Sequence, residues 1–190
     1  MAGLDENVVG VISPEYAWCL MVACIMALQV VLQGFAIGSQ RRKLFGTEFF
    51  KKNFPKMTNI PKGGYPDMGN GRYAQKLSIE EWESFNNYQR AHYNYVEGVA
   101  TAITLELVCG LFHPGVAVFA GLFYIIGRAL YAVGYRSRGP KGRLIGALMI
   151  DVALVVFLFF TFTSLYKAGG GYEGLLSVLK GTAREYGVEL

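Results

Sequence analysis

The sequence predicts an all-α integral membrane protein, a bundle of four membrane-spanning helices, and two observations carry that prediction. The 190-residue chain is 53% apolar and 17% charged, with a mean hydropathy of +0.31, whereas soluble domains carry about 25% charged residues. It also contains four apolar segments that could each cross a bilayer, which takes roughly 20 residues of helix. The length favours a single membrane domain over residues 1–190.

The first span is expected over about residues 14–38. Ser13 is a favourable N-cap residue, and Pro14 is favourable at the first helical position. Beyond Glu15 this segment carries no charged residue. The other three spans are expected at about residues 83–112, 114–135 and 143–167, separated by the turns around HPG and RSRGPKG.

The connections between the spans predict the topology. Residues 40–82 are basic at first and then rich in proline and glycine, so we expect a surface loop rather than a packed layer. The RSRGPKG turn is basic too. Since loops that stay inside are enriched in Lys and Arg, both connections are expected on the cytosolic side, or the matrix side of a mitochondrial membrane. Residues 172–186 are expected to form a short helix on the membrane surface.

Several classes of function are disfavoured. The three cysteines lie inside apolar segments, at spacings that fit neither a zinc site nor a disulfide framework. His92 and His113 stand at opposite ends of the second span, so no metal site is expected. The basic clusters flank apolar segments, where contact with membrane lipid explains them better than contact with nucleic acid.

A polar stripe enters the second span. Arg90, Asn94 and Glu97 stand at intervals of four and three, which places them on one face of a helix. Charged side chains inside a membrane are costly and are retained where they face protein, water or a ligand. We therefore interpret this stripe as part of a site for a small zwitterionic ligand.

The third span repeats the pattern near the same membrane surface. Arg128, Tyr131 and Tyr135 stand at intervals of three and four, and Arg143 begins the fourth span. Arginine pairs with carboxylates in a bidentate way, and glutamate accepts hydrogen bonds from an ammonium group. A ligand with carboxylates, an amine and peptide groups would match these side chains.

Each of these residues has another interpretation. Arg128 and Glu97 would neutralise one another inside the bundle, the two tyrosines would anchor at the headgroups, and Arg143 would only set topology. Their joint alignment on two helices favours the ligand site. Two other acidic residues lie at membrane depth: we expect Glu106 to extend toward the far interface and interpret Asp151 as structural, with contact to a neighbouring subunit or a ligand as the alternative.

Three segments resemble the MAPEG family of membrane glutathione-handling proteins, and within it the type 3 microsomal glutathione S-transferases. They are QRAHYNYVEG, FHPGVA, and IIGRALYAVGYRSRGPKGR with the GAL that follows. The resemblance covers roughly residues 14–166. It implies a homotrimer of the endoplasmic reticulum membrane, with a mitochondrial membrane as the alternative. It also implies glutathione as co-substrate, bound between adjacent subunits, and no metal.

The resemblance assigns roles by motif. It implies that glutathione is bound by Arg90, Asn94, Glu97, Tyr131, Tyr135, Arg41 and Arg42, with His92 and Arg128 in support. Arg143 matches the arginine that stabilises the thiolate and would be catalytic. A free thiol has a pKa of about 8.5, so a nearby cation makes the nucleophile available at neutral pH.

The predicted function is glutathione transfer to, or glutathione-dependent peroxide reduction of, lipophilic substrates from the bilayer. The chain departs from the family pattern at Gly98, where the related leukotriene synthase has a tyrosine that contacts glutathione, and in a longer 51–82 loop and C-terminal tail. These departures favour the alternative, an accessory subunit of a larger membrane complex with little or no catalysis. A lipid-binding regulator is a third interpretation.

Overall fold

The computed structural model describes residues 12–60 and 67–181, and within these ranges all regular structure is helical. The α-helices are α2 (Pro14–Leu44), α3 (Thr47–Asn53), α4 (Ile79–Phe112), α5 (Pro114–Arg138), α6 (Leu144–Ala168) and α7 (Gly171–Leu179). Helices α2, α4, α5 and α6 are long and apolar enough to cross a membrane. The predicted all-α membrane bundle is therefore confirmed. The end of the predicted 172–186 helix, from residue 182, lies outside the described residues.

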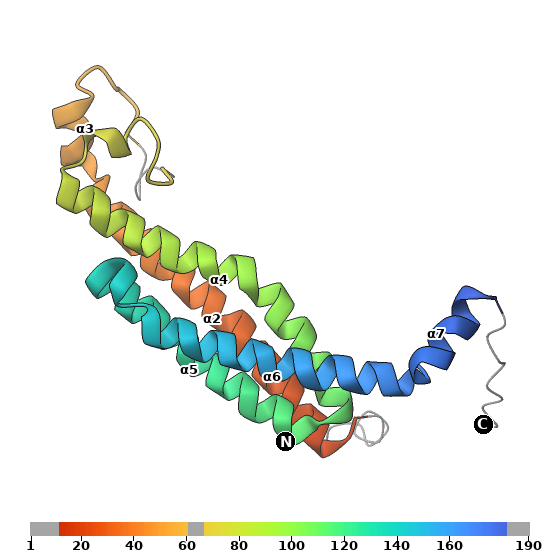
Figure 1. Cartoon of the computed structure of the whole chain (residues 1–190). Coiled ribbons are helices and arrows are strands. Elements are labelled where there is room, and N and C mark those ends of the chain that lie inside the picture. Colours follow the sequence, from red (N-terminus) through yellow and green to blue (C-terminus); the bar gives the residue numbers. More distant parts are fainter. Residues whose placement is uncertain (1–11, 61–66, 182–190) are drawn as a thin grey trace, which may run out of the picture.

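The four long helices run up and down as neighbours, with α4 packed against α2, α5 and α6 (Figure 1). Helices α2 and α4 lie side by side and continue, at the end that carries α3, past the turn between α5 and α6 (Figure 1). The two basic connections lie toward this end of the bundle. The turn between α4 and α5 lies at the other end, where α6 leads into α7 (Figure 1).

The helix ends follow from local capping. The Ser13 hydroxyl accepts a hydrogen bond from the Tyr16 amide at 3.2 Å and so caps α2. Ser78 and Glu81 form a reciprocal capping box that begins α4. Helix α2 extends to Leu44, beyond the expected end of the first span at residue 38, because the basic residues of its last turn interact favourably with the helix dipole.

The connection between α2 and α4 differs from the expected surface loop. It contains α3 and a 3-10 turn at Ala74–Lys76, and its aromatic side chains pack on the beginning of α4. The buried members of this aromatic cluster are Phe45, Phe50, Tyr73, Ala74 and Phe85. The Asp67 carboxylate accepts four backbone N–H bonds, at 2.8 to 3.2 Å, and so orders the glycine-rich part. Aromatic residues on α3 and in the proline- and glycine-rich part thus bury one another.

Helices α5 and α6 approach one another backbone to backbone. A Cβ atom placed on Gly146 would overlap the backbone of Tyr131 and Gly127, and Gly134 is equally close to Gly142. Small residues permit such close approach between membrane helices. The contact fixes Tyr131 on α5 opposite Arg143, the residue that precedes α6.

The expectation that the Glu106 side chain extends toward the far membrane interface is wrong. Its side chain is 0% exposed, and in the part of the chain that the structure describes neither carboxylate oxygen has a hydrogen-bond partner. It lies against α5, where a Cβ atom on Gly121 would be 2.6 Å from its Oε2. Glu106 is buried because it shares a face of α4 with Ala102 and Cys109, and that face packs against the core.

Candidate functional site

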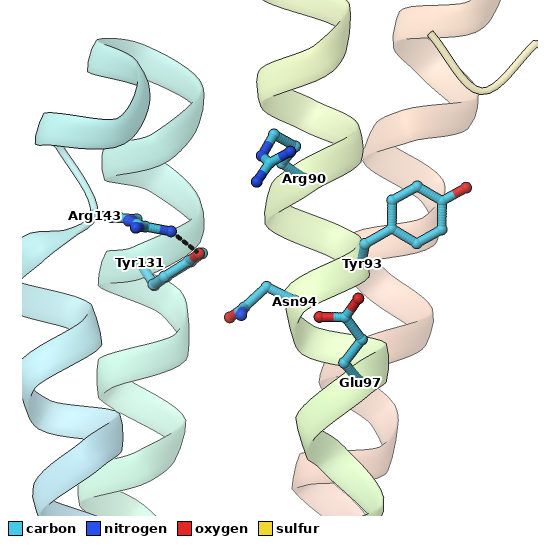
Figure 2. Close-up of a pocket in the computed structure, with 6 residues that line it drawn as sticks. All are labelled: Arg90, Tyr93, Asn94, Glu97, Tyr131 and Arg143. Carbon is cyan, nitrogen blue, oxygen red and sulfur yellow. Dashed lines mark hydrogen bonds between the residues drawn. The ribbon is translucent and has the colours of Figure 1, made fainter. Parts of the chain in front are cut away.

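The polar stripe on α4 faces the end of α5 across a recess of about 190 Å³. Figure 2 shows Arg90 and Asn94 extending from α4 toward Tyr131 and Arg143, with Glu97 about one turn deeper. The recess is thus lined by residues of α4 on one side and of α5 and the following turn on the other.

Hydrogen bonds orient the two arginines that border the recess. The Arg90 Nε donates to the Tyr135 hydroxyl at 3.1 Å, and the Arg143 Nη1 donates to the Tyr131 hydroxyl at 3.3 Å. The bond to Tyr131 raises the pKa of Arg143, so this guanidinium is cationic at every physiological pH. The Arg143 guanidinium also lies over the Tyr135 ring, 5.6 Å from its centre. Both cations are thereby held at the edge of the recess.

Arg128 is buried behind the stripe and does not line the first recess. Its side chain is 4% exposed and lies between the rings of Tyr95 and Tyr124, at 4.8 and 5.0 Å from their centres. It donates to the Asn94 Oδ1 at 2.7 Å and to the Tyr124 hydroxyl at 2.9 Å. No ion pair joins it to Glu97 within the described ranges. Arg128 therefore orients Asn94, whose amide N–H groups are left to meet a ligand.

Gly98 provides the space that Arg128 occupies. A Cβ atom at this position would lie 2.5 Å from the Arg128 Nη2. A glycine at position 98 thus accommodates the buried Arg128, because the guanidinium fills the volume that a larger residue would need.

We expect Gly98→Ala to lower stability by about 1–2 kcal/mol and to weaken ligand binding at Asn94, because the displaced guanidinium lengthens its bond to the Asn94 amide oxygen. Thermal unfolding measures the first effect, and calorimetric titration with glutathione, the ligand that the sequence resemblance implies, measures the second. Gly38→Ala is the matched control, since its Cβ atom would meet only an ordinary contact at 3.9 Å. Equal melting and binding in both variants would contradict the coupling.

Two further recesses adjoin the first and share Arg143 with it. One, of about 780 Å³, opens toward the α3 end and includes Trp82 and Asn87. The other, of about 430 Å³, extends along α6 and includes Asp151. Sequence reasoning missed Asn87 and Tyr93 as lining residues. Asn87 could have been found, because it stands three residues before Arg90 and continues the stripe.

Arg41, Arg42 and His92 are not brought to these recesses within one chain. His92 follows Arg90 by two residues, about 200° around the helix, and so faces α2, where its Cε1 lies 3.8 Å from the Cβ position of Gly34. The Arg41 Nη2 lies 3.4 Å from the Met68 Sδ, and the Arg42 side chain is exposed at the end of α2.

The recess carries charges of both signs, a pattern that a zwitterionic ligand would match. Arg90 and Arg143 offer cations to carboxylate or thiolate groups, and the exposed Glu97 carboxylate has no ion pair within residues 12–60 and 67–181. In the same ranges no three His, Cys, Asp or Glu residues are grouped to hold a metal ion.

Comparison with known families adds one finding. The family model of the MAPEG family matches residues 17–163, from the first turn of α2 to near the end of α6. This family includes glutathione transferases and related enzymes. The matched range contains every residue that lines the three recesses.

Proposed function

Because the chain belongs to the MAPEG family, we propose that it is a glutathione-dependent transferase or peroxidase that acts on lipophilic substrates from the bilayer. The observation that carries the proposal is the meeting of Arg90, Glu97 and Arg143 around one recess beside the apolar face of α6. The type 3 microsomal glutathione S-transferases are the branch that we propose.

Four groups of glutathione have a matching side chain in this proposal: one carboxylate, the ammonium group, a peptide oxygen and the thiol. Arg90 pairs with a carboxylate, Glu97 accepts from the ammonium group, and the Asn94 amide donates to a peptide oxygen. Tyr131 and Tyr135 hold the two arginines in place. Arg143 then lies nearest the thiol and stabilises the thiolate, after the thiol proton has passed to water.

The proposed reaction begins from this thiolate. In transfer, the sulfur attacks an electrophilic carbon, a C–S bond forms, and the leaving group departs with its electron pair. In peroxide reduction, the sulfur attacks a peroxide oxygen and the O–O bond breaks. A second glutathione then completes the conversion of one hydroperoxide and two glutathiones into an alcohol, glutathione disulfide and water.

The proposed assembly is a homotrimer in the endoplasmic reticulum membrane, with a mitochondrial membrane as the alternative. Arg41, Arg42 and His92 lie apart from the recess of their own chain. We propose that Arg41 and Arg42 reach the glutathione of an adjacent copy, with His92 in a supporting position, which gives the site a second pair of cations.

A titration of the purified protein with glutathione tests the proposal. We expect the ultraviolet absorbance of a thiolate to rise and to saturate at neutral pH, because the bound thiol ionises beside Arg143. Calorimetry on the same sample reports binding independently. No absorbance rise together with no binding heat would overturn the proposed function.

One observation favours a second candidate, an accessory subunit of a membrane complex. The aromatic cluster gives the segment between α2 and α4 a packed structure that a glutathione site does not require, with Lys51 and Lys52 exposed on α3. Purification in mild detergent separates the candidates. Stable comigration with other chains, and no trimer of this chain alone, would favour the accessory role.

A further inference from the structure

Asp151 places a carboxylate on an otherwise apolar helix. It belongs to α6, whose residues from Leu144 to Phe162 include no other charged side chain. At eight residues beyond Arg143, it lies about 12 Å further along the helix axis. A carboxylate at such depth is costly in lipid and is retained where it meets a cation, water or a ligand.

The surroundings of Asp151 supply no cation to it. The side chain is exposed, and it has no hydrogen bond or ion pair in the described part of the chain. The two arginines of the same recess have other partners: Arg128 donates to Asn94, and Arg143 donates to Tyr131. Among residues 12–60 and 67–181, the carboxylate therefore lacks a counter-charge.

Asp151 lines the recess of about 430 Å³ that continues from the glutathione recess along α6. Arg143 borders both recesses. The wall of the second one carries the apolar side chains of Leu144, Ala147, Ile150 and Leu154. The side formed by α4 and α5 carries Asn94, Glu97, Arg128 and Tyr131, and of the two carboxylates in this recess Glu97 is the one assigned to the ammonium group of glutathione. A second molecule in this recess would thus have one end beside Arg143, an apolar face against α6, and the negative charge of Asp151 about 12 Å further along that helix.

We propose that this recess binds the second substrate and that Asp151 selects amphiphiles carrying a protonated amine. The inference rests on the proposed function, because it takes the electrophile to the thiolate beside Arg143. The electrophilic atom lies at the Arg143 end, the hydrocarbon covers the α6 wall, and the ammonium group pairs with Asp151. The axial rise of about 12 Å between these residues sets the separation of electrophile and amine.

A matched pair of aryl chlorides tests the selection. Both are chloronitrobenzamides, one with a dimethylaminopropyl group on the amide and the other with the isosteric methylpentyl group. In each the glutathione sulfur forms a bond to the ring carbon and chloride leaves with the bonding electrons. We expect the wild type to prefer the amine, and Asp151→Asn to lower kcat/KM for the amine by about tenfold while leaving the alkyl probe unchanged.

The controls separate the possible causes. Asp151→Glu keeps the charge and should keep the preference, whereas Glu173→Gln removes an exposed carboxylate on α7, away from the recess, and should change neither rate. Thiolate absorbance must be the same in the wild type and Asp151→Asn. If the wild type shows no thiolate absorbance, the proposed function itself is wrong.

With the thiolate present, two results would overturn the selection by Asp151. One is an equal fall in kcat/KM for both probes in Asp151→Asn. The other is loss of the oligomer in Asp151→Asn, which would show that a second copy, and not the substrate, covers this carboxylate.

Discussion

We expect the Arg143→Ala variant to lose the proposed glutathione thiolate absorbance and to have a kcat/KM lowered by about 100-fold or more, because a positioned charge at the reacting atom is removed. A free thiol is only a few per cent ionised at neutral pH. The Arg143 guanidinium is held by Tyr131 at 3.3 Å and lies over the Tyr135 ring. Without it, no cation of the described residues borders both the recess of about 190 Å³ and the recess of about 430 Å³ along α6.

The control for this variant lies in the same basic turn. Lys141 is exposed and lines none of the three recesses, so Lys141→Ala removes the same charge from the loop without touching the site. If Arg143 only sets topology, both variants should behave alike. A thiolate signal that survives in Arg143→Ala, or disappears equally in Lys141→Ala, contradicts the assigned role.

Helical periodicity predicted much of this arrangement from the sequence. The spacing of Arg90, Asn94 and Glu97 places them on one face, and the structure shows that face lining a recess. Tyr131 and Arg143 were expected near the same membrane surface, and they border that recess as well. Apolar length and capping residues predicted the four long helices, because both signals are local in the chain.

Other features depend on which neighbour covers a face, and periodicity does not reveal this. Glu106 was expected at an interface but is enclosed against α5 beside Gly121. Arg128 shares a helical face with Tyr131, yet its long side chain turns back to Asn94, where Gly98 leaves room for it. Asp151 was interpreted as structural, and only the packing of α5 and α6 shows that it lines a recess.

The Arg143 site depends in turn on the close contact of α5 and α6, which a single methyl group would break. A Cβ atom on Gly146 would overlap the backbone nitrogen and Cα of Tyr131, and backbone atoms inside a helix pair have nowhere to move. We therefore expect Gly146→Ala to cost about 4 kcal/mol, at the upper end for point substitutions. For a chain of this length, that loss lowers the melting temperature by roughly 10 °C.

An alanine substitution in α5 separates the effect of the clash from the general effect of losing a glycine. A Cβ atom on Gly115 would meet nothing within 4 Å, so Gly115→Ala should melt no lower than the wild type. The separation of α5 from α6 in Gly146→Ala should also draw Tyr131 away from Arg143 and weaken the thiolate signal in the protein that remains folded. Equal melting of the two variants would show that the helices can part without cost. The glycine contact would then not be what fixes Arg143 at the edge of the recess.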